Sequence, residues 1–211
     1  MRIALIGATG LVGGEIARRL AGAELLLLSR RPGGVGAREI VAPVEQWGEA
    51  LSGETIDVAM SALGTTIAKA RSREAFDRID RVAVLDFARA ARASGARQFI
   101  LVSSVGADPD ARAFFLATKG RIEQQLGVVG FDRLDILRPG LLRGARAEHR
   151  LGEAIALRVA PLADRFLPNR FAAYRSIDAG EVAAAAVGLI AQGGSGQFVH
   201  QGAQLVARGA R

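Results

Sequence analysis

The 211-residue chain has no cysteine and only two histidines, which narrows the chemistry open to it. Without cysteine there is no disulfide framework, no thiol nucleophile and no thiolate metal site. His149 and His200 have no partner at the spacing of a metal site or a catalytic triad. The carboxylates are scattered and form no acid and base pair. We therefore expect no metal site.

Long hydrophobic runs are also missing. The longest apolar stretch, 182–191, is shorter than the roughly 18 residues that a membrane-spanning helix needs. Only residues 3–6 are apolar before Gly7, whereas the core of a secretion signal takes roughly 7–15 residues. These features predict no membrane partner, no secretion by that route and a cytoplasmic location.

The composition, 50% hydrophobic and 23% charged, is that of one globular domain, which we expect to span residues 1–211. The formal net charge of +7 would suit nucleic acid, because arrays of basic side chains neutralise phosphates. The arginines, however, are spread through Ala-rich segments, so we expect solvated surfaces and no nucleic-acid partner. Binding through this basic surface without a cofactor stays open as a minor alternative.

Short aliphatic runs alternate with amphipathic stretches, which is typical of a doubly wound α/β fold with a parallel sheet. Apolar residues at helical spacing predict helices over 78–93 and 113–126. Asp178 and Glu181 resemble a capping box ahead of a last helix that reaches Ile190. The expected strands span residues 2–6, 24–28, 39–42, 56–61, 98–103, 133–137 and 197–200.

Two segments lack a regular pattern. Residues 30–38 hold a proline and three glycines and predict a loop. Residues 140–169 contain no clean strand. Because ligands of such sheets bind beyond the carboxyl ends of the strands, we expect about residues 140–175 to cover the substrate side of a site.

A glycine pattern follows the first expected strand and opens a helix. Gly7 permits a tight turn, Gly10 lets the backbone approach a pyrophosphate, and Gly13 allows close helix packing. The free N–H groups and the dipole at the start of such a helix favour a phosphate. The pattern predicts a dinucleotide-binding turn, the alternative being a turn that serves packing alone.

The end of the second expected strand indicates which dinucleotide binds. NAD-specific proteins usually place a carboxylate there for the ribose 2′-hydroxyl, whereas this chain has Ser29, Arg30 and Arg31. Arginine binds phosphate through paired hydrogen bonds, so we expect NADP(H) to be preferred over NAD(H). Chance surface charge is the alternative in so arginine-rich a chain.

Small residues follow the fourth expected strand at 61–66 and would let the backbone pass close to a dinucleotide. With Asp57 and Val58 before it, this run is a candidate wall of the cofactor site. An ordinary turn is the alternative.

These motifs, together with runs further along the chain, resemble one family. The matching runs are 7–13, 29–31, 57, 63–66, 101–108, 119–120, 131–133 and 137–140. They resemble the atypical short-chain dehydrogenases/reductases, closest to the Tat-interacting-protein oxidoreductase subfamily. The resemblance implies a single-domain Rossmann fold that binds NADPH.

The resemblance also indicates which residues contact the cofactor. They come from the glycine turn, the ends of two strands, one helix and the segment after Pro139. The expected contacts are Gly7, Thr9, Gly10, Leu11, Val12, Gly13, Arg30, Arg31, Asp57, Val58, Leu63, Gly64, Lys119, Leu142 and Arg150.

In that family a serine polarises the carbonyl, a tyrosine transfers the proton, and a lysine four residues later lowers the pKa of the tyrosine. Ser103 and Ser104 match the serine and Lys119 matches the lysine, but Phe115 stands at the tyrosine position. Phenylalanine cannot donate a proton, so the usual general acid is missing. The only tyrosine, Tyr174, lies before the last helix and is an alternative acid.

Two functions remain open. An NADP(H)-dependent oxidoreductase would reduce a small carbonyl or quinone, with Ser103 or Ser104 polarising the substrate and Lys119 holding the cofactor. The missing tyrosine motivates the other function, a non-catalytic NADP(H)-binding regulator or assembly factor with a protein partner. By analogy with related folds, either could form a homodimer.

Overall fold

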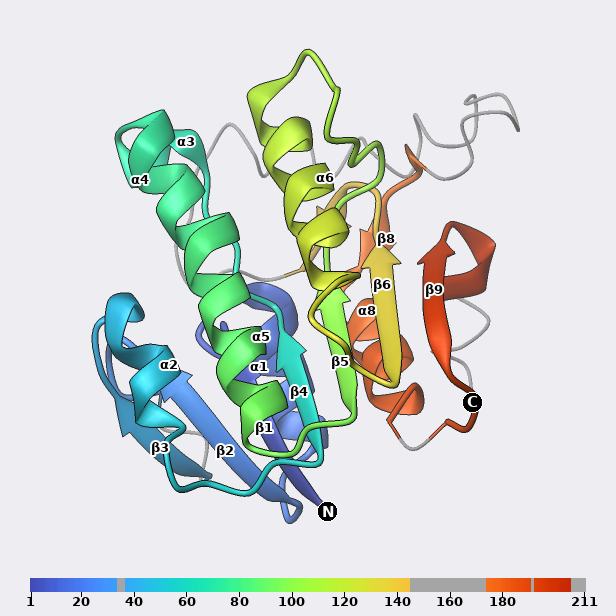
Figure 1. Cartoon of the computed structure of the whole chain (residues 1–211). Coiled ribbons are helices and arrows are strands. Elements are labelled where there is room, and N and C mark those ends of the chain that lie inside the picture. Colours follow the sequence, from blue (N-terminus) through green and yellow to red (C-terminus); the bar gives the residue numbers. More distant parts are fainter. Residues whose placement is uncertain (34–36, 145–173, 191, 206–211) are drawn as a thin grey trace.

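The structure, a computed structural model, describes residues 1–33, 37–144, 174–190 and 192–205 (Figure 1). Seven parallel strands form one sheet in the order β3-β2-β1-β4-β5-β6-β9. The predicted doubly wound α/β fold is confirmed. The strands are β1 (Arg2–Ile6), β2 (Glu24–Ser29), β3 (Arg38–Val41), β4 (Val58–Ser61), β5 (Gln98–Val102), β6 (Arg133–Arg138) and β9 (Gly196–Gln201).

The strand order reverses between β1 and β4. These strands are neighbours in the sheet although β2 and β3 separate them in the chain. Their ends are level, since Ile6 pairs with Ser61. In sheets of this kind the ligand binds at such a reversal, beyond the carboxyl ends of the strands. We call this end of the sheet the carboxyl edge.

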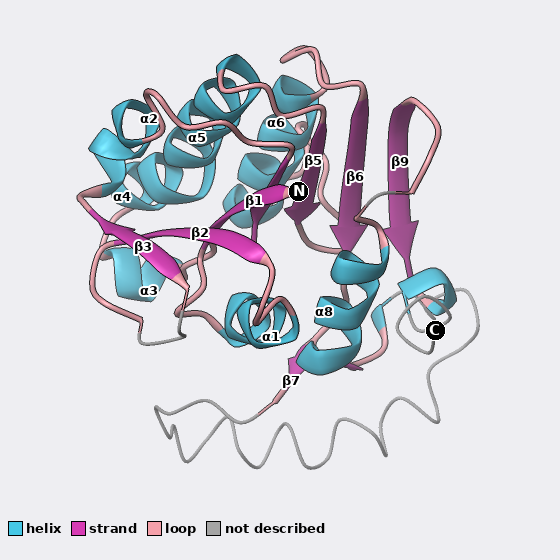
Figure 2. Cartoon of the chain, turned by 90° about the horizontal axis from the view of Figure 1, so that it is seen from below, coloured by secondary structure: helices cyan, strands magenta, loops and turns pink. Residues whose placement is uncertain are grey.

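Helices cover both faces of the sheet (Figure 2). One face carries α1 (Leu11–Arg19) and α8 (Ala179–Gly188), and the other carries α2 (Trp47–Ala50), α5 (Ala83–Ala93) and α6 (Phe114–Leu126). Coverage on both sides explains why β5 is buried throughout and β2 reads as a continuous run of leucines.

One helical segment is longer than predicted. It starts with α4 (Arg73–Asp77), continues through a π-turn (Arg78–Val82) and runs into α5. The remaining short helical elements are α3 (Ile67–Ala70), which packs against α4, and a 3₁₀ turn (Val44–Gln46), which leads into α2. A π-turn inside a helix is rare and frequently marks a functional site.

Two short strands were not predicted, because two residues show no period. β7 (Leu142–Arg143) pairs in parallel with β8 (Ile177–Asp178), and the Ile177 N–H donates to the Leu141 carbonyl at 2.9 Å. This pair brings the chain after β6 next to the chain before α8. Of the predicted cover 140–175, residues 145–173 lie outside the described residues.

The predicted capping box at the start of α8 is confirmed. Asp178 accepts a hydrogen bond from the Gly180 N–H at 2.7 Å, and Glu181 accepts one from the Asp178 N–H at 3.1 Å. Within the described ranges, no helix combines the length and apolar character needed to cross a bilayer.

Candidate functional site

The glycine turn lies at the carboxyl edge and touches the turn after β4. Gly7 has a φ of +86°, which favours glycine, and an added Cβ would lie 2.5 Å from the Ala62 carbonyl carbon and the Leu63 nitrogen. The backbones of the two turns are therefore in direct contact. Any side chain at residue 7 would force them apart.

The start of α1 packs closely against the glycine turn on one side and is exposed on the other. A Cβ on Gly13 would lie 2.1 Å from the Gly7 carbonyl oxygen, so this glycine is needed for packing. Gly10 caps α1 without a side chain and is exposed, as is Thr9. Val12 is buried in the core, so only its backbone can face a ligand. Because the cap residue is a glycine, no capping side chain accepts hydrogen bonds from the N–H groups at the start of α1.

Arg30 and Arg31 follow β2 and are exposed. Glu39 on β3, which was not predicted from the sequence, holds the turn that carries them. The Glu39 carboxylate accepts hydrogen bonds from Ser29 Oγ at 2.7 Å and from the Gly33 N–H at 2.9 Å. The two guanidinium groups thus stand on a fixed turn beside the glycine turn.

The structure does not bring Asp57 and Val58 to this edge. Val58 pairs with Ile3 near the start of β1, and the Asp57 carboxylate accepts a hydrogen bond from the Arg2 N–H at 2.7 Å. Both residues lie at the amino end of β4, a strand length of about 10 Å from the glycine turn. They serve the start of the sheet and are left out of the candidate site.

The turn after β4 leads to a buried ion pair. Lys119 Nζ on α6 lies 2.8 Å from Asp80 Oδ1 in the π-turn, and the two side chains are 6% and 0% exposed. The second oxygen of Asp80 accepts a hydrogen bond from the Thr65 N–H at 2.9 Å. Lys119 was predicted from the sequence, whereas Asp80 was not. We call these two residues the Asp80 pair.

Burial raises the pKa of the Asp80 carboxyl above its ordinary range. The Lys119 ammonium and the Thr65 N–H stabilise the carboxylate and only partly oppose that effect. A pair of this kind is costly to form in a protein interior, which makes it a candidate for a role other than stability.

Phe115 lies beside the Asp80 pair. Its ring centroid is 6.0 Å from Lys119 Nζ and 5.8 Å from the centroid of the buried Phe76 ring. Helical spacing therefore places residue 115 close to the lysine, as the resemblance implies, but with an apolar ring in place of a phenol.

The two serines after β5 differ in their surroundings. Ser103 is buried and its hydroxyl donates to the Glu123 carboxylate, which also pairs with Arg138 at 2.5 Å. Ser104 is half-buried, and its Oγ lies 3.3 Å from the Val105 carbonyl oxygen. Ser103 is held by a buried network, so Ser104 has the hydroxyl better able to meet a ligand. Glu123 and Arg138 were not foreseen.

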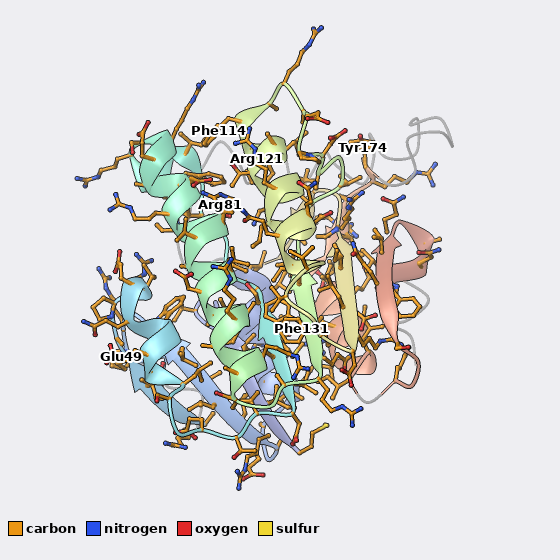
Figure 3. All side chains as sticks on the ribbon, viewed as in Figure 1. Glu49, Arg81, Phe114, Arg121, Phe131 and Tyr174 are labelled. Carbon is orange, nitrogen blue, oxygen red and sulfur yellow. The ribbon has the colours of Figure 1, made fainter. Side chains whose placement is uncertain are left out.

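Tyr174 reaches the same end of the molecule as the first turn of α6, where Phe114 lies (Figure 3). Its hydroxyl would lie 3.4 Å from a Cβ on Gly106, in the loop that follows the two serines. Leu142 lies in β7 close to this segment. Arg150 and His149 fall outside the described residues.

His200 lies near the end of β9, in a cluster around Asp135, which lies in the middle of β6. His200 Nε2 donates to Asp135 at 2.9 Å, and Arg133 and Gln98 donate to the same carboxylate at 2.6 and 2.8 Å. We call these four residues the Asp135 cluster. An open hollow of about 490 Å³ borders it, lined by Arg97, Gln98, Asp132, Arg133 and residues 192–195. Among the described residues no group of His, Asp and Glu could hold a metal ion.

Comparison with known proteins places the chain among relatives of one kind. It is 36% identical over 165 residues to "Protein FMP52, mitochondrial" of Candida albicans, covering 72% of each chain. It is also 36% identical over 167 residues to the protein of the same name from Aspergillus niger, covering 72% of this chain and 71% of that one. No protein-family model matches.

Solved structures share the fold at low sequence identity. A UDP-glucose 4-epimerase of Thermotoga maritima has a TM-score of 0.72 at 13% identity, covering 95% of this chain and 77% of its own. A short-chain dehydrogenase/reductase superfamily protein of Agrobacterium tumefaciens with bound NAD has a TM-score of 0.70 at 16% identity. The match covers 98% of this chain and 80% of that one. A human epimerase family protein with NADPH has a TM-score of 0.63 at 19% identity. The match covers 94% of this chain and 73% of that one. The fold is therefore Rossmann-like.

The predicted cytoplasmic location is wrong, since the relatives are named mitochondrial proteins. The prediction rested on the missing cysteine and the missing secretion signal. The missing cysteine excludes a disulfide framework, but it does not distinguish between compartments in which thiols stay reduced.

Proposed function

The chain belongs to the FMP52 family, and we propose that it is an NADP(H)-binding oxidoreductase of the atypical short-chain class that reduces a small carbonyl or quinone. One observation carries the proposal: the glycine turn lies at the strand reversal, against the turn after β4, with an uncapped helix start in front of it. This arrangement suits a pyrophosphate.

The residues along the carboxyl edge fit an extended dinucleotide. A Cβ on Gly10 would lie 3.2 Å from the Gly7 carbonyl oxygen, so a side chain there would crowd the turn before α1. From β2 to β5 the sheet crosses three strand intervals, about 14 Å in all. Arg30 and Arg31 stand at one end of this span, and Lys119 and Ser104 stand at the other.

The preference for NADP(H) rests on the two arginines. They are exposed at the end of β2, where an adenosine ribose would lie, and no carboxylate occupies their positions. A 2′-phosphate would gain charged hydrogen bonds from them, whereas a 2′-hydroxyl would gain little. Glu39 holds the turn that carries the two arginines by accepting hydrogen bonds from Ser29 Oγ and the Gly33 N–H.

Hydride transfer is the chemistry that this cofactor supplies when bound. Ser104 would donate a hydrogen bond to the substrate carbonyl oxygen, and Ser103 would hold the end of β5 in place through Glu123. Lys119 would donate to a ribose hydroxyl. The proton that an alcohol product needs cannot come from Phe115, which leaves Tyr174 or water to supply it.

The finer resemblance, to the Tat-interacting-protein oxidoreductase subfamily, is part of this proposal. It is supported by the runs 63–66, 101–108 and 119–120, which lie at the carboxyl edge or on α6 beside it. Either a small-molecule substrate or a protein partner would meet the protein at this edge.

The second candidate function is that of a non-catalytic NADP(H)-binding regulator or assembly factor. Phe115 favours it, because its ring packs on Phe76 and puts an apolar ring in place of a phenol beside Lys119. Incubation of the protein with NADPH and a panel of small aldehydes, ketones and quinones distinguishes the two. The oxidoreductase proposal predicts NADPH oxidation that depends on an acceptor. Binding of NADPH without oxidation by any acceptor would favour the regulator.

A further inference from the structure

Among the residues that the structure describes, the Asp80 pair is the most deeply buried pair of charges at the carboxyl edge. Lys119 Nζ and Asp80 Oδ1 are 2.8 Å apart, on side chains that are 6% and 0% exposed. Removing two charges from water costs several kcal/mol for each, so a buried pair is weak support for stability. Its retention in this position calls for another explanation.

The π-turn explains how the carboxylate reaches the interior. Asp80 is buried in the middle of the segment 78–82, whereas Asp77 and Asp86 on the same helical segment are half-buried and exposed. A π-turn adds a residue to the helix and changes which side chains face inward. Here it turns an acidic side chain toward α6 and Lys119.

The Asp80 pair also holds the turn after β4. Asp80 accepts a hydrogen bond from the Thr65 N–H, and a Cβ on Gly64 would lie 3.8 Å from Asp80 Oδ1 and 4.0 Å from Lys119 Nζ. Gly64 is exposed on the other side of this contact. The pair therefore lies directly behind the backbone along which the dinucleotide is proposed to run.

We infer that Asp80 is a positioning residue that holds the Lys119 ammonium for the nicotinamide ribose, in a site where Phe115 offers only an apolar ring. This inference rests on the proposed function. The carboxylate fixes the place of Lys119 Nζ, and through Thr65 it fixes the turn beside it. Both constraints act on the nicotinamide half of the cofactor, since the adenosine half lies toward Arg30 and Arg31.

The test compares two ligands that share only the adenosine half. NADPH contains both halves, whereas adenosine 2′,5′-bisphosphate keeps the 2′-phosphate and lacks nicotinamide and its ribose. In Asp80→Asn the amide oxygen can still accept from the Thr65 N–H, but the charge that holds Lys119 is lost. We expect the affinity for NADPH to fall about tenfold or more, and the affinity for adenosine 2′,5′-bisphosphate to change less than about twofold.

Two controls are matched to the variant. Asp77→Asn removes the half-buried pair with Arg81 on the same helical segment and should leave both affinities unchanged. Lys119→Met should reproduce the loss for NADPH, while Lys69→Met, at the only other lysine, should not. The double variant Asp80→Asn/Lys119→Met removes both charges, so it provides a folded comparison if the single variant is unstable.

Each outcome decides the inference. An unchanged NADPH affinity in Asp80→Asn and in the double variant would overturn it. Equal losses for both ligands would also overturn it, because they would indicate general damage to the fold. If the wild-type protein bound neither ligand, the proposed function would fail and the inference with it. If the wild-type protein bound both and only the selective loss were missing, the inference alone would fail.

Discussion

Two of the buried carboxylates in this sheet and its helices, Asp135 and Asp80, differ in their surroundings. Asp135, in the Asp135 cluster, accepts four hydrogen bonds from Arg133, Gln98 and His200. Asp80, in the Asp80 pair, has one ammonium and one backbone N–H. The first lies in the sheet away from the carboxyl edge, and the second lies at that edge.

The pKa values of the two groups move in opposite directions. Burial acts to raise the pKa of Asp135, but hydrogen bonds from His200, Arg133 and Gln98 outweigh it and hold the pKa below its ordinary value. Burial dominates at Asp80 and raises its pKa. A fully satisfied buried carboxylate fixes structure, whereas one with few partners stays responsive to what binds beside it.

The largest effect is expected at the Asp135 cluster. Asp135→Ala leaves Arg133 and His200 buried without their shared acceptor, and we expect the free energy of unfolding to fall by about 3–5 kcal/mol. Urea unfolding followed by circular dichroism measures it. Asp132→Ala breaks an exposed pair with Arg97 and should cost less than about 1 kcal/mol. If Asp135→Ala lowered the free energy of unfolding as little as Asp132→Ala, the structural role of the Asp135 cluster would be refuted.

The next effect is expected beside the Asp80 pair. Phe115→Tyr places a phenol near Lys119, and we expect the rate of carbonyl reduction with NADPH to rise about a hundredfold or more. Steady-state kinetics with the acceptors of the panel measures it. Phe114→Tyr adds the same hydroxyl one residue away and should change little. A Phe115→Tyr variant that binds NADPH but stays inert would count against a reductase pocket.

A smaller effect is expected at the end of β2. The double variant Arg30→Ser/Arg31→Ser removes the proposed 2′-phosphate contacts, so the affinity for NADPH should fall about tenfold or more while that for NADH stays the same. Fluorescence titration measures both. Arg89→Ser, on the exposed side of α5, is the matched control. Equal losses for the two cofactors would refute the assigned selectivity.

The smallest effect is the pH dependence that separates the two carboxylates. Because the fold lowers the pKa of Asp135, its contribution to stability is present above the ordinary carboxyl pKa and is lost as the pH falls through the folded value. Asp80 has the opposite sign, since its raised pKa favours the protonated form in the folded state. Between about pH 5 and pH 3, Asp135→Asn should therefore lose less stability than the wild type.

Urea unfolding of both variants across that range is the measurement. Asp80→Asn should not reduce the loss of stability at low pH, because protonation of Asp80 favours the folded state. If both variants lost equally less stability at low pH than the wild type, the opposite pKa directions of Asp135 and Asp80 would be contradicted.

Much of the fold was predictable from the sequence because local patterns determine it. The strands were predicted to within two residues at each end, and the capping box at Asp178 marked the start of α8 closely. The pair β7 and β8 was missed because two residues carry no period. The predicted helix 78–93 lacked its first turns, α4, since a π-turn interrupts the 3.6-residue pattern.

The site was predictable only where a motif is contiguous. The glycine turn, Arg30 and Lys119 lie in such motifs, whereas Asp80 meets Lys119 across a separation of 39 residues that no local pattern reveals. A signal did exist, because Asp80 lies four residues before Val84 on the face expected to be apolar. Asp57 and Val58 were expected in the site because they precede the run 61–66, but they lie at the opposite end of β4 from the glycine turn.

The most direct test of the central claim is a calorimetric titration of the purified protein with NADPH and, separately, with NADH at moderate salt. The account predicts micromolar binding of NADPH and binding of NADH that is weaker by about tenfold or more. Binding of neither cofactor would contradict the reading of the glycine turn, and tighter binding of NADH would contradict the role of Arg30 and Arg31.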